Sequence, residues 1–111
     1  MGVEIEVARE GTRAVVTVRG AIDEGGAEVM RQHFSELLQG ETVEEVVLDM
    51  AGVSRIGSSG IGKILLFYKN LGLRGGRLVV RNLETHLYEL FRELKLDTLF
   101  TVQGTVQGKQ R

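Results

Sequence analysis

The sequence predicts a single α/β domain with a small, mixed and mostly parallel sheet, an N-terminal antiparallel hairpin and crossover helices. Three observations carry this prediction. Apolar and polar residues alternate near the N-terminus, short runs rich in β-branched residues recur along the chain, and stretches of helical spacing separate these runs. Strands that alternate with helices of about ten to fifteen residues imply right-handed crossovers and a largely parallel sheet.

The hairpin comes from the first two predicted strands. Apolar residues occupy every second position over residues 3–7 and again over residues 13–19. The turn at residues 9–12 is short, so the two strands are expected to pair antiparallel. Gly20 is expected to close the second strand.

A first helix follows, with the Asp23 side chain as its expected N-cap and Gly40 as its stop. Five apolar residues keep helical spacing between them: Ala27, Met30, Phe34, Leu37 and Leu38. A buried strand over residues 45–50 comes next, then a connector and a second helix that reaches about Leu71.

The last third of the chain repeats this alternation. Residues 77–81 form a strand, and Asn82 is expected to cap a third helix. The apolar face of that helix comprises Leu83, Leu87, Leu90, Phe91 and Leu94. Residues 96–102 are expected to add an extended segment beside the sheet. The domain is therefore predicted to span residues 1–102, with a flexible polar tail over residues 103–111.

The run from Gly57 to Gly62 lies where the second helix is expected to begin, and it contains Ser58 and Ser59. The first N–H groups of a helix lack partners within the helix, and the helix dipole is positive there. A serine caps such donors, and a phosphate is stabilised at the same place. In parallel sheets this turn also lies at the carboxyl end of a strand, where open α/β sheets keep their sites. A capping serine alone is common in proteins, so the flanking residues decide whether the pair is functional.

Composition excludes several classes of function. The 111 residues carry a net charge of −1 with acids and bases interspersed, which argues against binding to nucleic acid or to anionic membranes. The chain has no cysteine, so neither a disulfide framework nor a thiolate metal site is expected. No signal peptide or apolar run of about 20 residues is recognisable, which predicts a cytoplasmic protein.

Several segments together resemble the STAS domain family, particularly the bacterial anti-sigma factor antagonists. The strand residues 47–50, the serine run at residues 56–62, and the segments 18–23, 75–80 and 90–94 carry the resemblance, which covers roughly residues 3–102. It implies a switch protein rather than an enzyme, without cofactor or metal. In that family the antagonist binds an anti-sigma factor that is itself a serine kinase. The kinase phosphorylates a serine at the helix start, which breaks the complex, and a phosphatase resets the cycle.

By position, the resemblance assigns the phosphorylated hydroxyl to Ser58, with Ser59 as its neighbour. The expected partner-binding surface combines the glycines of the turn with the exposed side of the second helix, namely Gly57, Gly60, Gly62, Lys63, Leu66 and Phe67. The last four of these point away from an expected core stripe made of Ile61, Ile64, Leu65 and Tyr68. On so apolar a helix, Leu66 and Phe67 are alternatively part of the core.

Two positions depart from the family pattern. Gly57 stands where family members commonly carry Asp immediately before the serine, which affects recognition by a kinase or indicates binding without phosphorylation. Lys95 stands where many relatives have glycine after the last helix. The Gly57 departure keeps a second role within the family open, that of an adaptor of a lipid-transport ATPase complex or a scaffold of a stress-signalling assembly.

Other chemistries fit the residues less well. The run from Gly57 to Ile64 nearly matches a phosphate-binding P-loop, but Ile64 replaces the hydroxyl that holds Mg²⁺, which leaves weak nucleotide binding as the alternative. The serine hydrolase elbow is absent because Ile61 follows Gly60. His33 and His86 are isolated and predict neither a catalytic base nor a metal site.

Overall fold

The computed structural model describes residues 2–105 of the chain. The elements in order are β1 (Glu4–Glu10), β2 (Arg13–Ile22), α1 (Glu24–Gln39), β3 (Glu45–Ile56), α2 (Ser58–Leu73), β4 (Arg77–Leu83), α3 (Thr85–Glu93), the 3₁₀ turn η1 (Leu96–Thr98) and β5 (Thr101–Gly104). None of the helices within residues 2–105 is long and apolar enough to cross a membrane.

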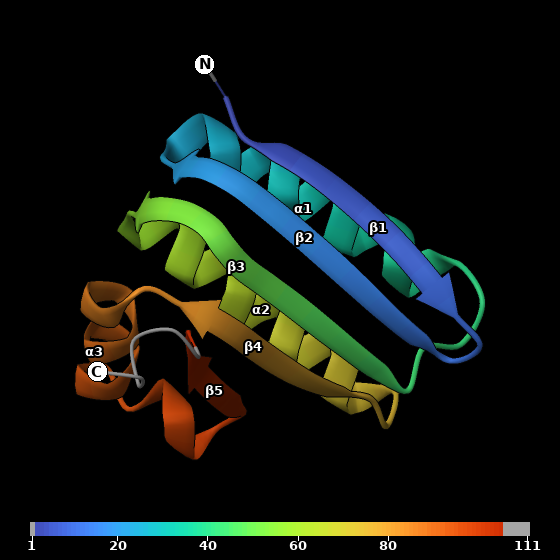
Figure 1. The fold of residues 1–111 in the computed structure, drawn as a ribbon. Coiled ribbons are helices and arrows are strands. Elements are labelled where there is room, and N and C mark those ends of the chain that lie inside the picture. Colours follow the sequence, from blue (N-terminus) through green and yellow to red (C-terminus); the bar gives the residue numbers. More distant parts are fainter. Residues whose placement is uncertain (1, 106–111) are drawn as a thin grey trace.

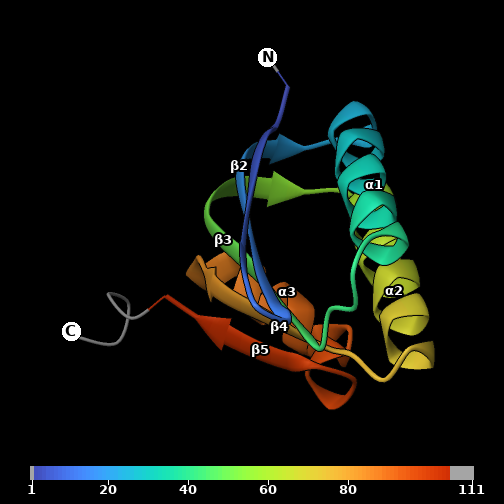
Figure 2. The ribbon, with the colours of Figure 1, turned by 90° about the vertical axis from the view of Figure 1, so that its right-hand side faces the viewer.

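The five strands form one sheet in the order β1-β2-β3-β4-β5 (Figure 1). β1 pairs antiparallel with β2, and every other neighbouring pair is parallel. The predicted fold class, a mixed and mostly parallel sheet with an N-terminal hairpin, is therefore confirmed. Each parallel connection moves one strand further in the same direction, and right-handed crossovers then bring successive helices to one face of the sheet. Figure 2 shows α1 and α2 side by side on that face.

The core lies between this face and the helices. Alternate residues of the three central strands are fully or almost fully buried: Ala14, Val16, Val18, Val46, Leu48, Met50, Leu78 and Val80. Where α1 meets α2, the rings of Phe34 and Phe67 stack with centroids 4.1 Å apart and planes 9° apart. This pair holds the two helices against each other and in register on the sheet.

No helix lies over the opposite face of β2 and β3 in the part of the chain that Figure 2 describes. Strand register places Val15, Val47 and Val79 side by side there as a short apolar row. Beside that row, Glu45 accepts a hydrogen bond from Arg13 Nε at 3.1 Å and lies 3.4 Å from Arg77 Nε. Charged side chains that pair across strands keep this face compatible with water, so the sheet needs only one helical layer.

Every predicted strand before the third helix ends too early: β1 reaches Glu10 and β4 reaches Leu83, and the extensions of β2 and β3 share one cause. β2 continues past Gly20 to Ile22, and β3 continues past Met50 to Ile56. The two strands stay paired as far as Ile22 and Ile56, through two register shifts that allow the chain to bend. Pairing with a neighbouring strand therefore converts the expected connector into strand and leaves Gly57 as the only residue between β3 and α2.

Asn82 does not cap α3, contrary to the prediction. It lies in β4 with a left-handed φ of 63°, and its Nδ2 donates to Asp49 Oδ1 at 3.1 Å. Asparagine adopts this conformation more readily than most residues, because its short polar side chain finds local partners. The N-cap of α3 is Glu84, without a side-chain hydrogen bond.

The third helix is also shorter than its apolar pattern predicts. Leu87 and Phe91 of α3 are buried, but Leu83 belongs to β4 and Leu94 lies beyond the helix with 48% of its surface exposed. Lys95 follows with a left-handed φ of 66°, a conformation that suits the glycine common at this position in the resembled family.

The segment after α3 contains the predicted extended stretch only in part. Residues 96–98 form η1, and β5 pairs parallel with β4 from Thr101 onward. β5 reaches Gly104, so two residues expected to open the polar tail belong to the sheet. Thr105 donates its N–H to the Leu83 carbonyl at 2.9 Å, and residues 106–111 of the expected tail lie outside the described residues.

Candidate functional site

The junction between β3 and α2 is a single residue. Gly57 is the N-cap of α2 in an extended conformation, with φ −93° and ψ 179°. Its N–H donates to the Ile22 carbonyl at 3.0 Å, and its carbonyl accepts from Ile61 N at 3.1 Å. The first bond ties the start of α2 to the carboxyl end of β2, and the second belongs to the first turn of α2. The start of the helix is thereby held at the edge of the sheet where parallel α/β folds keep their sites.

No side chain caps this helix, and its first turn contains no acidic residue. The expectation that a serine serves as the cap is therefore wrong: Ser58 is the first residue inside α2. A glycine cap has no oxygen to offer the first N–H groups. The positive end of the helix dipole consequently has no protein anion at the cap or in the first turn.

Both serines lie in this first turn, with different exposure. Ser58 is exposed, whereas Ser59 is half-buried. The Ser58 hydroxyl is thus the one that another protein reaches without any rearrangement of the fold. A negative charge added to it would lie at the positive end of α2, where such a charge is stabilised.

Gly60 sets how closely the turn packs on the sheet. A Cβ atom at this position would lie 2.7 Å from side-chain carbons of both Ile22 and Ile56, which is too close for any real contact. Gly62, one position past Ile61, has no atom within 4 Å of the corresponding point and is exposed. Gly60 therefore serves internal packing, and Gly62 leaves a bare patch on the outer side of the helix.

The predicted outward residues of α2 separate into two groups. Leu66 has 50% of its surface exposed and Lys63 is half-buried, so both remain on the accessible side. Phe67 is only 2% exposed and stacks on Phe34, so its predicted role in partner binding is wrong and its alternative placement in the core is correct.

The physical reason is that α2 is apolar on two adjacent stripes. The expected stripe and the observed one share Ile61 and Ile64, but the buried continuation is Phe67 and Leu71 rather than Leu65 and Tyr68. Leu65 and Tyr68 are half-buried and pack against the margin of the core. Both stripes have helical spacing. The stacking of Phe67 on Phe34 of α1 determines which of them is buried.

A charged pair on α1 lies beside this part of α2. Glu28 accepts three hydrogen bonds from the Arg31 guanidinium, at 2.7 to 3.1 Å. These bonds lower the pKa of Glu28, against a smaller opposing effect of desolvation, and the positive charges of Arg31 and Lys63 lower this pKa further. The same pair raises the pKa of Arg31. Lys63 itself forms no ion pair with any of residues 2–105.

The run that nearly matches a P-loop in sequence does not form the loop that this motif requires. That motif needs a loop of several residues that wraps a phosphate before the helix begins. Here α2 already begins at Ser58, and Gly60, Gly62 and Lys63 all lie within it. Residues 57–64 therefore lack the geometry of a P-loop.

Each histidine contacts a backbone carbonyl, His33 within α1 and His86 across from α3 to β3. His33 Nδ1 lies 3.0 Å from the Val29 carbonyl oxygen, and His86 Nε2 lies 3.0 Å from that of Ser54. Within the described range 2–105, no three His, Asp or Glu side chains gather closely enough to hold a metal ion. Asp23 caps α1 through a 2.9 Å hydrogen bond from Gly26 N, as predicted.

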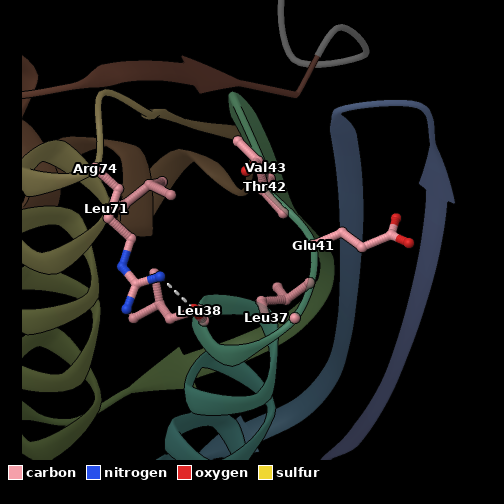
Figure 3. Close-up of a pocket in the computed structure, with 8 residues that line it drawn as sticks. Leu37, Leu38, Glu41, Thr42, Val43, Leu71 and Arg74 are labelled. Carbon is pink, nitrogen blue, oxygen red and sulfur yellow. Dashed lines mark hydrogen bonds between the residues drawn. The ribbon is translucent and has the colours of Figure 1, made fainter.

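A separate hollow of about 260 Å³ lies at the other ends of α1 and α2. Figure 3 shows its apolar lining, which includes Leu37, Val43 and Leu71, and the bond from Arg74 to the Leu38 carbonyl that spans the helix ends. None of the predicted site residues lines it. It lies a full helix length, roughly 20 Å, from Ser58.

The contribution of α1 to the accessible surface cannot be recognised in the sequence. Arg31, Ser35 and Leu38 of α1 line a shallow hollow together with Lys63 and Leu66 of α2. No local pattern in the sequence signals this, because the residues come from two helices about thirty positions apart whose relative register is set by packing in the core.

Three comparisons connect this geometry with known proteins. The sequence profile of the STAS domain family matches residues 4–108. An anti-sigma F factor antagonist from Paenibacillus polymyxa is 26% identical over 102 residues, which is 92% of this chain and 85% of the relative.

Solved structures share the fold. An anti-sigma factor antagonist from Mycobacterium paratuberculosis superposes with a TM-score of 0.82 at 23% identity, covering 96% of this chain and 89% of that one. The Bacillus cell fate determinant SpoIIAA in its phosphorylated form superposes with a TM-score of 0.73 at 19% identity, covering 95% of each chain. The sequence match over nearly the whole described range, together with this shared architecture, shows that the chain belongs to the STAS domain family.

Proposed function

We propose that this protein is an anti-sigma factor antagonist, a binding protein rather than an enzyme, that acts in the cytoplasm and is switched off by phosphorylation of Ser58. The partner is an anti-sigma factor with serine kinase activity, and a serine phosphatase restores the unmodified form. The observation that carries the proposal is the exposed Ser58 hydroxyl in the first turn of an uncapped helix. The antagonist named among the relatives and the phosphorylated form of one structural neighbour support it.

Electrostatics explains why such a modification would leave the fold intact. A phosphoserine carries about −1.5 to −2 charges at neutral pH. At Ser58 this charge lies at the positive end of α2, and the first turn of α2 holds no carboxylate that would repel it. Phosphorylation is therefore expected to stabilise the helix start and to act only on partners, through its bulk and its charge.

The proposed partner-binding surface surrounds the hydroxyl. It consists of Gly57 and Ser58 at the junction and Gly62, Lys63 and Leu66 along the outer side of α2. Ser59 lies beside the acceptor and, being half-buried, has a supporting part. Gly60 acts indirectly, because its missing side chain lets the turn pack on Ile22 and Ile56.

Gly57 favours a second candidate function. Antagonists of this family commonly carry Asp at this position. The glycine therefore lacks a negative charge that a kinase would meet beside the serine. Under this alternative the domain is an adaptor of a lipid-transport ATPase complex or a scaffold in a stress-signalling assembly, and it binds through the same surface without phosphorylation.

The test is purification of the full chain with its bound proteins from the native cell, followed by mass spectrometry of the partner and of Ser58. We expect one partner that also binds a sigma factor and that transfers phosphate from ATP to Ser58 in a purified mixture. Recovery of transporter subunits, with Ser58 unmodified under all growth conditions, would establish the adaptor role instead.

A further inference from the structure

The hollow between α1 and α2 extends the accessible surface beyond the serine turn. We define the α1–α2 groove by the residues on its walls, Arg31, Ser35 and Leu38 of α1 and Lys63, Leu66 and Asn70 of α2. Its floor is the stacked pair of Phe34 and Phe67. Because these rings hold both helices in register, the groove is a fixed feature of the fold.

We propose that the α1–α2 groove binds an amphipathic helix of the partner whose apolar side meets Leu66 and whose acidic side chains meet Lys63 and Arg31. This inference rests on the proposed function, since it names the chemistry of the partner element that docks beside Ser58. It assigns a role to α1, which the serine turn alone does not involve.

The spacing of the outer residues of α2 matches a helix. Ser59, Gly62, Leu66, Lys69 and Leu73 follow one another at intervals of three, four, three and four positions. Residues at these intervals form a single line along a helix, of the kind that a second helix at a shallow crossing angle contacts. This line runs beside the groove and shares Leu66 with its wall. Leu66 and Leu73 are 50% and 79% exposed, so two apolar anchors of this line face solvent.

Gly62 leaves the outer side of α2 open beside the groove, one turn before Leu66. No atom lies within 4 Å of the place where its Cβ would be, so the helix backbone itself is accessible there. Small residues on a helix surface allow a second backbone to approach closely. A partner helix that extends over this side of α2 can thus come closest about 6 Å along the axis from Ser58.

The charges of the groove select an acidic occupant. Its charged wall residues are Arg31 and Lys63, both basic. Arg31 is already bonded to Glu28, whereas Lys63 forms no ion pair within residues 2–105. The positive end of α2 adds to the same potential. A carboxylate of the partner would therefore find its counter-charge at the end of the groove nearest Ser58.

This arrangement also gives phosphorylation a physical means of release. A phosphate on Ser58 places negative charge about 7.5 Å along the helix axis from Lys63. It would repel an acidic helix at the point where that helix meets the basic end of the groove. The same charge that stabilises α2 would thus displace the partner.

The test uses two stapled helical peptides of about 14 residues, each with two leucines seven positions apart, one carrying glutamates and the other lysines at the flanking positions. Binding to the full chain is followed by ¹⁵N–¹H NMR titration. We expect the acidic peptide to shift the resonances of Ser35, Lys63, Leu66 and Asn70, and to bind at least about tenfold more tightly than the basic one, a difference of about 1.4 kcal/mol.

Two variants and a control sharpen this test. Lys63→Glu should reverse the preference between the peptides, and Leu66→Ala should weaken the acidic peptide by about tenfold or more. Leu94→Ala is the matched control, since Leu94 is 48% exposed but lies after α3, and it should bind as the wild type does. Equal binding of the two peptides, shifts outside the groove, or no binding at millimolar peptide would overturn the proposal.

Self-association is measured in the same samples by sedimentation. A dimer of the chain that Leu66→Asp dissociates would assign the groove to a second copy and so contradict the proposal.

The groove proposal and the proposed function can be refuted independently of each other. If Ser58 substitutions change the affinity of the partner but Lys63→Glu and Leu66→Ala do not, only the groove proposal is refuted. If the chain binds the acidic peptide but is never phosphorylated at Ser58, only the proposed phosphorylation switch is refuted.

Discussion

Gly60 and Gly62 lie two positions apart on α2, yet a methyl group added at each meets different surroundings. At Gly60 it would overlap Ile22 and Ile56, whereas at Gly62 it would meet only solvent. Gly60 is therefore needed for the close approach of α2 to the sheet. Gly62 is not needed for folding, and glycine within a helix costs conformational entropy.

The paired alanine substitutions test this difference. Gly60→Ala should lower the free energy of unfolding by about 1–3 kcal/mol, because the core must shift to accommodate the methyl group. Gly62→Ala should raise it by about 0.5–1 kcal/mol, because alanine favours an exposed helix position. Urea unfolding followed by circular dichroism measures both. Similar effects of the two substitutions would show that the turn does not pack as described.

The N-cap position makes a second residue-scale prediction. The φ and ψ of Gly57 are accessible to any residue, and a Cβ there meets no atom closer than 3.9 Å. Gly57→Asp would place a carboxylate at the uncapped start of α2 and should stabilise the domain by about 0.5 kcal/mol at neutral pH. Gly57→Asn, a neutral cap, should give part of this gain. Thermal unfolding of both variants is the measurement, and a loss of stability in Gly57→Asp would contradict the uncapped helix start.

At the scale of elements, α2 shows how a neighbouring helix resolves an ambiguity of sequence. Leu65, Leu66, Phe67 and Tyr68 are consecutive apolar or aromatic residues, so periodicity alone allows more than one buried face. The observed face is the one that brings Phe67 onto Phe34. Leu66 is left on the outside as a consequence, available for a partner.

Adjacent residues of this helix should therefore differ sharply in their effect on stability. Phe67→Ala removes a buried ring and should cost about 3–5 kcal/mol of unfolding free energy. Leu66→Ala changes a half-exposed side chain and should stay within about 0.5 kcal/mol of the wild type. Chemical denaturation of the two variants decides the matter, and a large cost for Leu66→Ala would place that residue in the core instead.

The elements that sequence patterns predict correctly are those with local causes. The alternation of the hairpin strands and the Asp23 cap depend on residues a few positions apart. The wrong predictions have causes far along the chain. Asn82 takes a left-handed conformation in contact with Asp49, thirty-three positions earlier, and β3 is prolonged by its pairing with β2. No local pattern around residues 51–55 or 82 contains that information.

At the scale of the whole molecule, the sheet separates two kinds of surface. One face carries the helices and, at the carboxyl ends of β2 and β3, the serine turn (Figure 1). The opposite face carries ion pairs between strands, such as Glu45 with Arg13 and Arg77. The exposed apolar anchors Leu66 and Leu73 lie on α2, the helix that begins at Ser58, which is why we assign partner binding to the helical side.

The candidate site was predictable in part for the same reason as the fold. The place of Ser58 follows from the change of spacing between strand and helix, which is local. Its exposure, the absence of a cap and the part played by α1 depend on how α2 packs against β2 and α1. Those properties arise only once residues distant in the sequence have been brought together.

Titration of the purified anti-sigma partner with Ser58→Ala and Ser58→Asp, measured by calorimetry, tests the central claim most directly. The account predicts that Ser58→Ala binds as tightly as the unmodified wild type, because it keeps the surface neutral. It predicts that Ser58→Asp binds about tenfold to a hundredfold more weakly, a loss of about 1.4–2.8 kcal/mol. Equal affinities of the two variants, with both correctly folded, would contradict the claim that charge at the start of α2 controls binding.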